Sequence, residues 1–531
     1  MKSTGRILVL EDEERWREIF GSALRTADYQ VDIASSVAEA RDFLNHNFYH
    51  LAVIDVSMVF GDGSNREGLD FVGELERTEH GEGLKVILIS AYMEKTRVRE
   101  AFKKFKVADF QDKYDFDEAN FLTDVRKVVE DSINLNLEVQ WESRGQRDQV
   151  VLNLEVEGER VKRDTPLQAR VADELEDLLC RLFPEAQSLL VRPLTAGLSG
   201  SAVLRATPFL NEGAATPVVV KFGAVKRIKR EYENFKKYAE PFIRARSTNI
   251  IKLNQTTHLA GITYSLLGSR GDDIKSFREF YPRHDLAQIQ ETLTRLFSET
   301  CAAWYANHSP LRLCNLTNEY CQKLELTEEK LQIAFSQLKG VQGKGQLYFD
   351  SIKGRGFTNP LIASADREFQ RSTYVCYTHG DLNSDNILVD ESNEAWLIDF
   401  EYTGPGHILR DIAEMDLVVR AELLGAEEAS LSERLELEEA LFKARSFKDL
   451  ESLRDSFDTQ NPALAKAYAT VLHLRTIAAD MVSKNPSADF EEYYIGLFYY
   501  SLNALRFLSW RAVARQHCLL SACLIADKLG L

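Results

Sequence analysis

Apolar residues follow two different spacings over the first 130 positions of the chain. Five short apolar runs predict β-strands, at residues 6–10, 30–34, 50–55, 84–89 and 107–111. The segments between and after them repeat apolar residues every three or four positions, as helices do, at residues 14–27, 37–47, 68–79, 94–106 and 116–134. Five alternating β and α units with apolar strands predict a parallel, doubly wound α/β sheet, whose functional residues lie at the carboxyl ends of the strands.

Polar residues of one chemical kind stand at those strand ends. Glu11 and Asp12 follow the first strand, Asp55 ends the third, Ser90 follows the fourth and Lys113 follows the fifth. Three carboxylates brought together repel one another unless a cation lies between them, and carboxylate oxygens suit Mg²⁺. Asp55 could then serve as a nucleophile towards a phosphoryl donor, with a hydroxyl and an ammonium group nearby to bind the phosphoryl oxygens. The alternative is that these acidic residues are only solvated loop residues. This interpretation is weaker because five side chains of suitable chemistry stand at four strand ends.

Along residues 1–130 the chain resembles the receiver domain of bacterial response regulators, a flavodoxin-like fold. The resemblance implies that a sensor histidine kinase phosphorylates Asp55, that Glu11, Asp12 and Asp55 bind Mg²⁺, and that Ser90, Phe110 and Lys113 respond to the phosphoryl group. It also allows a homodimer through this domain. Two features depart from the family pattern.

The first departure is Tyr114, which stands where receivers usually have the proline that sets the loop geometry. The second is a long, Gly-rich loop over residues 56–67, which we expect to be exposed. This loop could affect the choice of partner or the lifetime of the phosphoryl group, and a neutral insertion fits equally well.

Residues 131–165 form a charged connector. Two alternating runs, 135–141 and 150–156, flank a polar turn, which predicts a β-hairpin. The runs carry more β-branched and aromatic residues than a flexible linker does, so we expect the hairpin to pack on a neighbouring surface.

Residues 166–268 begin with a predicted helix from Pro166 to about Phe183. Five strands then follow, at 189–194, 202–207, 217–222, 250–254 and 262–267. The first two strands enclose the small residues of Gly197-Leu-Ser-Gly-Ser201, which would let backbone N–H groups approach phosphates, although an ordinary hairpin turn has the same composition. Lys221 lies near the end of the third strand, and the helix after it carries two candidate partners, Glu231 and Glu233.

The stretch from Tyr377 to Tyr402 carries a set of residues suited to phosphoryl transfer. Asp381 follows His379-Gly380, Asn386 comes five residues later, and a strand-like run ends at Asp399. Transfer from ATP needs a carboxylate near the acceptor hydroxyl, and an amide and a second carboxylate for Mg²⁺. The spacing between the aspartate and the asparagine alone recurs by chance, and a plain β-hairpin would share it, but the nested set is more demanding.

This stretch resembles the catalytic loop of the aminoglycoside phosphotransferase and choline kinase superfamily. The resemblance implies a bilobal, protein-kinase-like α+β domain, with an N-lobe at 166–268 and a largely helical C-lobe at 269–531 whose catalytic loop spans 379–386. It makes Asp381 the base, assigns Asn386 and Asp399 to Mg²⁺, and favours Glu231 over Glu233 beside Lys221. The residues that it assigns to ATP are Gly197, Ser199, Gly200, Ser201 and Lys221, those with a structural role are His379 and Asp411, and residues 268–273 would form the hinge.

Composition narrows the partners. The formal net charge is −17 with a pI near 5.3, which opposes nonspecific binding to nucleic acid or to anionic membranes and permits a cationic substrate. Asp416 and Glu422 could face such an acceptor, and a solvated helix face explains them equally well. The chain has 7 cysteines with no Cys-x-x-Cys pair and no membrane-spanning run, as expected of a cytoplasmic protein with reduced thiols.

The sequence therefore predicts a response regulator whose receiver controls an ATP-dependent phosphotransferase acting on an unidentified hydroxyl acceptor, either a small molecule or a protein. The alternative is a non-catalytic domain that binds nucleotide or a partner and is switched by the receiver. A protein kinase ranks third, because the short segment 400–407 leaves no room for a long activation loop.

Overall fold

The computed structural model describes most of the chain. The described residues are 5–59, 65–77, 83–91, 105, 107–131, 133–156, 158–195, 200–242, 248–266, 274–365, 367–425, 427–485 and 489–531. The chain divides into two compact units, Met1–Tyr232 with Asn249–Leu266, and Glu233–Thr248 with Leu267–Leu531. Each unit is described by itself.

The N-terminal domain is the predicted parallel sheet. Its strands are β1 (Arg6–Leu10), β2 (Gln30–Ala34), β3 (Leu51–Asp55), β4 (Lys85–Ser90) and β5 (Asp109–Asp112), in the spatial order β2-β1-β3-β4-β5. Its helices are α1 (Glu14–Thr26), α2 (Val37–His46), α3 (Glu67–Leu75) and α5 (Glu118–Glu130). The helix predicted at 94–106 lies outside the described residues, except for Phe105.

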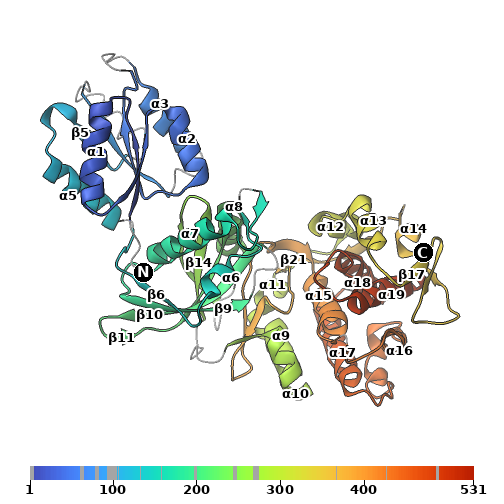
Figure 1. The fold of residues 1–531 in the computed structure, drawn as a ribbon. Coiled ribbons are helices and arrows are strands. Elements are labelled where there is room, and N and C mark those ends of the chain that lie inside the picture. The colour runs from blue at the N-terminus through green and yellow to red at the C-terminus, as the bar shows by residue number, and fades with distance from the viewer. Residues whose placement is uncertain are drawn as a thin grey trace. The chain divides into compact units, whose positions relative to one another are not determined.

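Both faces of this sheet are covered, which explains why its central strands β1, β3 and β4 are almost wholly apolar. Alternate strand residues such as Val9 and Val53 pack with α1 and α5, and their neighbours Leu8 and Ile54 pack with α2 and α3. Figure 1 shows the two pairs of helices on opposite faces of the sheet. The strands therefore point their carboxyl ends to one common edge.

The connector does not form the predicted hairpin. Its first run becomes β6 (Glu138–Trp141), which pairs in parallel with β9 (Ser188–Thr195) of the next sheet. The second run is divided between α6 (Gln146–Val150) and β7 (Glu155–Val156), and β7 pairs with β8 (Glu159–Arg160). The reason is packing, because Val150, Val151 and Leu154 are buried in the core, as helical spacing allows and strand spacing does not. The expectation that the connector packs on its neighbours is confirmed.

The second sheet contains all five predicted strands. Besides β9 these are β10 (Ser201–Leu210), β12 (Val218–Ala224), β13 (Thr248–Gln255) and β14 (Leu259–Leu266), and the order is β13-β14-β12-β10-β9-β6. A short β11 (Gly213–Ala214) pairs with β10. Helix α7 (Pro166–Leu182) begins as predicted, with Thr165 as its N-cap, and α8 (Val225–Asn234) follows β12.

A buried chain of polar groups joins α7 to the amino edge of the N-terminal sheet. Nδ1 of His50 accepts a hydrogen bond from the backbone N–H of Arg6 (2.7 Å), so its proton lies on Nε2, which donates to Asp177 Oδ1 (2.5 Å). Asp177 Oδ2 accepts from Arg181 Nε (2.9 Å), and Arg181 donates in turn to the carbonyl of Gly83 (2.9 Å). We name these residues, His50, Asp177, Arg181 and Gly83, the α7 bridge.

The second unit is mainly helical. Its helices are α9 (Phe277–Phe280), α10 (Leu286–Arg295), α11 (Ala302–Ala306), α12 (Leu316–Lys323), α13 (Glu328–Ser336), α14 (Pro360–Ala363), α15 (Arg410–Leu417), α16 (Leu431–Leu441), α17 (Pro462–Val482), α18 (Phe490–Ala504) and α19 (Ala512–Lys528). Its short strands are β15 (Lys275–Ser276), β16 (Arg312–Asn315), β17 (Val341–Gly343), β18 (Gln346–Phe349), β19 (Phe357–Thr358), β20 (Gln370–Thr373), β21 (Val375–Thr378), β22 (Ile387–Val389), β23 (Ala395–Leu397) and β24 (Gly404–His407). The helices α15 to α19 pack together (Figure 1).

Among the described residues, no helix has both the length and the apolar character that crossing a bilayer requires.

Candidate functional site

The predicted strand-end residues of the N-terminal domain come together around Lys113. Its Nζ lies 2.6 Å from Asp55 Oδ2 and 2.8 Å from Glu11 Oε1, and all three side chains are buried. Asp55 is held at the end of β3, where its Oδ1 also accepts from the backbone N–H of Ser57 (3.1 Å). The parallel order of the sheet produces this cluster, because it brings strands β1, β3 and β5 to one edge.

The carboxylates of this cluster fit a divalent cation. Ligand oxygens of Glu11, Asp12 and Asp55 all lie within 4.8 Å of one another, and the buried Glu11 Oε2 has no hydrogen-bond partner among the described residues. Burial and the neighbouring Asp55 raise the pKa of Glu11 to about 8, and burial also raises the pKa of Asp55. A bound Mg²⁺ would offset the negative charge of these carboxylates and could bind Oε2 of Glu11.

Burial alone would lower the pKa of Lys113, but the charges of Asp55 and Glu11 outweigh it and raise that pKa. The lysine therefore stays protonated beside Asp55.

The remaining predicted residues of this edge lie where the sequence placed them. Ser90 is buried at the end of β4, and Phe110 is partly buried on β5. In place of the missing proline, Asp112 caps a 3₁₀ turn over Lys113–Asp115, and its Oδ1 accepts from the backbone N–H of Tyr114 (2.9 Å). A side-chain cap therefore sets this loop, and the Tyr114 side chain is exposed.

Gly68 is a residue of this site that the sequence reasoning missed. It lies in the first turn of α3, and a Cβ there would stand 1.8 Å from the backbone oxygen of Asp55. Only glycine allows this approach. The sequence offered one indication of this role, which is that Gly68 comes directly after the long loop. Residues 60–64 of that loop lie outside the described part of the chain.

Strand β12 and helix α8 bring Lys221 and Glu231 together, as the sequence predicted. Lys221 Nζ lies 2.7 Å from Glu231 Oε2, and both side chains are fully buried. Of the predicted small-residue turn, Gly200 and Ser201 are described, and Gly200 has a positive φ of 84°. Gly197 and Ser199 lie outside the described residues, as does the expected hinge at 268–273.

In the second unit, the loop 379–386 holds Asp381 and Asn386 side by side. Nδ2 of Asn386 donates to the backbone oxygen of Asp381 (2.8 Å) and to its Oδ2 (3.2 Å), while Asn383 donates to Oδ1 (3.2 Å). The pairing of β22 with β23 places Ile398 opposite Asn386, through a backbone hydrogen bond of 3.0 Å. Asp399 follows Ile398 directly and is buried, with a positive φ of 72°.

Asp411 holds the backbone at the start of this loop. Its two carboxylate oxygens accept from the backbone N–H groups of His379 (2.8 Å) and Gly380 (2.9 Å), and the fully buried Arg410 donates to the carbonyl of Gly380 (2.7 Å). Gly380 has a φ of 84°, and a Cβ there would lie 2.4 Å from the Tyr402 carbonyl oxygen. The ring of His379 bonds the Ile398 carbonyl (3.1 Å), which ties the loop to β23.

A second carboxylate lies beneath Asp381. Glu414 Oε2 accepts from the backbone N–H of Leu382 (2.8 Å), and burial together with the charge of Asp381 raises the pKa of Glu414 well above its usual value. Asp411 and Glu414 therefore bind the backbone on both sides of Asp381.

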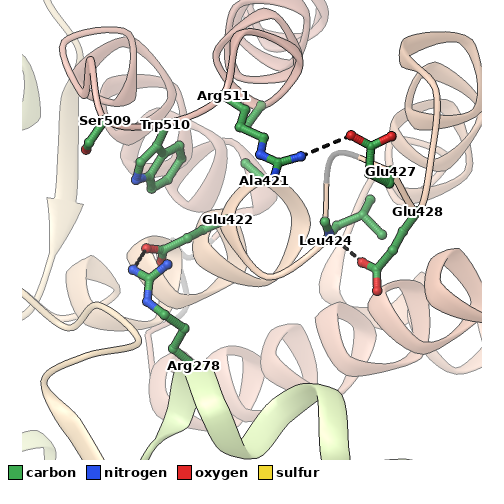
Figure 2. A pocket seen from close by; sticks show the side chains of 11 residues that line it. Arg278, Ala421, Glu422, Leu424, Glu427, Glu428, Ser509, Trp510 and Arg511 are labelled. Atoms are coloured by element: carbon green, nitrogen blue, oxygen red, sulfur yellow. Dashed lines mark hydrogen bonds and ion pairs between the residues drawn. The ribbon is translucent and has the colours of Figure 1, made fainter. Parts of the chain in front are cut away.

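Sequence reasoning also missed a cavity of about 430 Å³, and two of its lining residues, Arg278 and Glu422, bind side chains of the loop (Figure 2). Arg278 forms a two-pronged ion pair with Asp385 (2.8 and 2.9 Å) and also binds Glu422, which accepts from Ser384. The lining residues include Arg278, Glu422, Glu428, Ser509, Trp510 and Arg511. Nothing in the sequence links Arg278 to a loop more than a hundred residues away.

The suggested role of Asp416 in facing an acceptor is wrong. Asp416 is fully buried and paired with Arg420 (2.5 Å) and Arg475 (2.9 Å). Glu422 does line the cavity, with its carboxylate already bound by Arg278.

Comparison with known families now identifies the N-terminal domain. Residues 7–125 match the family model of the response regulator receiver domain, and with the strand order and the Asp55 cluster this makes the domain a receiver of a two-component system. Residues 186–352 and 346–506 match the model of the ternary complex associated domain 9, and together these segments span more than half of the chain. The protein belongs to the ternary complex associated domain 9 family.

Solved structures similar to this chain include response regulators and their receiver domains. A CheY-like receiver from Methanospirillum hungatei is 18% identical, with a TM-score of 0.22, and the match covers 24% of this chain and 96% of that chain. A response regulator from Thermotoga maritima is 23% identical, with a TM-score of 0.21, over 24% of this chain and 98% of that chain. The regulator TrrA from the same organism, solved with Mg²⁺ and BeF, is 26% identical, with a TM-score of 0.20, over 24% and 99%. No curated protein matches the chain.

Proposed function

We propose that the protein is a response regulator in which phosphorylation of Asp55 controls an ATP-dependent phosphotransferase, the output formed by residues 166–531. The acceptor is a hydroxyl group, and Asp381 is the base that receives its proton. The donor for Asp55 is a sensor histidine kinase.

The observation that carries the proposal is the arrangement of Asp381, Asn386 and Asp399. Because the Nδ2 of Asn386 is committed to Asp381, its Oδ1 is the atom left to bind a metal. Asp399 comes shortly after β23, which pairs with β22, the strand that begins directly after Asn386. An amide oxygen together with a carboxylate is a set of ligands that fits Mg²⁺. When bound, Mg²⁺ would neutralise charge on the ATP phosphates.

The loop is also built to keep Asp381 in place. Asp411 binds the two N–H groups that precede Asp381, and Glu414 binds the one that follows it. An isolated β-hairpin turn would have no need of two buried carboxylates that accept from three backbone N–H groups of one loop. A base held by fixed backbone needs little reorganisation when the acceptor proton leaves.

In the first unit, Lys221 and Glu231 form a buried pair of the type that orients a lysine toward phosphates. The receiver belongs to the same compact unit as this pair and contacts it through α7 and the second sheet. We propose that phosphorylation of Asp55 changes the affinity of the output for ATP through this unit.

The experiment uses the full chain with Mg²⁺ and ATP. Titration calorimetry measures ATP binding, with and without beryllofluoride to mimic phosphorylation of Asp55, and consumption of labelled ATP is followed against a panel of alcohols, amino alcohols and sugars. Binding and turnover in the wild type, with turnover lost in Asp381→Asn, are expected. The matched control is Asp390→Asn, in the turn between β22 and β23, which should keep turnover.

Two results would contradict the proposal. If ATP does not bind in either receiver state, ATP is not the phosphoryl donor of this protein. Binding without turnover on any acceptor, unchanged by Asp381→Asn, identifies a nucleotide-binding scaffold instead of an enzyme.

A further inference from the structure

The carboxylate of Glu231 has a donor for each of its oxygens. Oε2 faces Lys221 Nζ at 2.7 Å, and Oε1 accepts a hydrogen bond from the hydroxyl of Tyr264. All three side chains are at most 1% exposed. Glu231 is thus held between an ammonium group and a phenol, away from water.

The register of the second sheet explains why Tyr264 reaches this carboxylate. Strands β12 and β14 are antiparallel, with Lys221 opposite Ile262 and Val219 opposite Tyr264. Residues 219 and 221 point to the same face of the sheet, so Tyr264 is the diagonal neighbour of Lys221 on that face. Helix α8 supplies Glu231 to both residues.

We propose that Tyr264 is a positioning residue for the phosphate-binding lysine. Its hydroxyl fixes one oxygen of Glu231, which leaves the other directed at Lys221 and holds the ammonium group in one orientation. A phenol suits this role because it is a neutral donor, so Glu231 keeps its full charge for Lys221. This inference rests on the proposed function, in which Lys221 binds the phosphates of ATP.

A purely structural role for Tyr264 makes a different prediction. A ring that only fills the core would affect every ligand of the domain alike when altered. A residue that acts through Lys221 affects only ligands that carry phosphates. Adenosine, ADP and ATP therefore separate the two roles, since adenosine lacks the phosphates.

The test is Tyr264→Phe in the full chain, which removes one oxygen and keeps the ring. Titration calorimetry in Mg²⁺ should show affinity for ATP and ADP falling about 10-fold, the usual effect of losing a buried hydrogen bond to a charged group, with adenosine changed less than about twofold. The matched control is Tyr49→Phe in the receiver, whose buried hydroxyl donates to Asp32 Oδ2 (2.8 Å). It should leave all three affinities unchanged.

A double-mutant cycle with Glu231→Gln completes the test. If Tyr264 acts through Glu231, adding Tyr264→Phe to Glu231→Gln lowers ATP affinity no further. Independent, additive effects overturn the inference, as does an equal loss for adenosine and ATP or no loss for either. If Tyr264→Phe does not fold, Tyr264→Met carries the same expectation, because its flexible side chain can fill the space. Failure of the wild type to bind ATP would instead refute the proposed function, whatever the variants do.

Discussion

The α7 bridge gives a prediction about how firmly the receiver is attached. Asp177→Asn removes the one carboxylate of the bridge and keeps the size of the side chain. Asp177 is 1% exposed and lies between His50 and Arg181, which is 5% exposed. Without the negative charge, the guanidinium group of Arg181 is left buried without its counter-ion.

The magnitude follows from the pKa of Asp177. Burial by itself would raise this pKa, but the charge of Arg181 and the hydrogen bonds from Arg181 and His50 lower it from 3.8 to about 2. A depression of this size corresponds to about 2 kcal/mol of stability at neutral pH. Because the folded pKa lies below the unfolded one, this stability is fully present above about pH 4 and disappears as the pH falls from 4 to 2.

The assay is hydrogen exchange of the full chain, read by mass spectrometry on peptides from α7 and β3, which isolates this part of a two-unit protein. Asp177→Asn should lower the free energy of opening in these peptides by about 2 kcal/mol at pH 7. The difference from wild type should narrow as the pH is lowered toward 3.

The matched control is Asp173→Asn, one turn earlier on α7. Asp173 is 42% exposed and pairs with Arg6 and Arg147, so its loss should cost less than about 1 kcal/mol. Equal costs for the two variants, or a difference that does not change with pH, would refute the idea that a buried charge pair attaches the receiver to α7.

Three further predictions concern the two candidate sites. Gly68→Ala should destabilise the receiver by about 2 kcal/mol in urea unfolding, because the added methyl group meets the backbone of Asp55. In the control Gly73→Ala the methyl group meets only the Phe105 ring, and stability should change by less than about 1 kcal/mol. Equal effects of the two variants would contradict this reasoning. Asp55→Asn should abolish labelling of the full chain by acetyl phosphate, and labelling that persists would show that another residue is the acceptor. Asp411→Asn should speed hydrogen exchange in peptides covering residues 379–386 about 10-fold or more, since one backbone N–H loses its acceptor, and unchanged exchange would show that Asp411 does not hold the loop.

The receiver could be predicted almost completely because its sequence is locally consistent. The central strands β1, β3 and β4 are almost wholly apolar, and a parallel sheet leaves one edge for the polar residues at the carboxyl ends of β1, β3, β4 and β5. Asp381, Asn386 and Asp399 were predicted in another way, from their spacing and from a family pattern, and one loop and one short hairpin fix their positions. The choice of Glu231 over Glu233 depended on a family pattern, and the burial of Glu231 is the physical reason why that pattern holds.

The misses have a common physical cause, which is contact between distant segments. The run at 150–156 is rich in β-branched residues, which favour a strand, and only the burial of Val150, Val151 and Leu154 in the core shows that its first part turns as a helix does. Asp416 looked like a surface acid because its partner Arg475 is 59 residues away. Arg278 had no local pattern to mark it, since its partners Asp385 and Glu422 come from other elements.

The α7 bridge and the phosphorylation site lie at opposite ends of the same strand. His50 immediately precedes β3 and Asp55 closes it, so the length of one strand, roughly 17 Å, separates attachment from chemistry. A histidine kinase that reaches the Asp55 edge thus has no need to displace the receiver from α7. A different receiver grafted onto α7 would bring its own phosphorylation chemistry at one end of its sheet. At the other end it would need a histidine before its third strand, a carbonyl before its fourth, and the apolar and Arg6–Asp173 contacts that this receiver makes with α7.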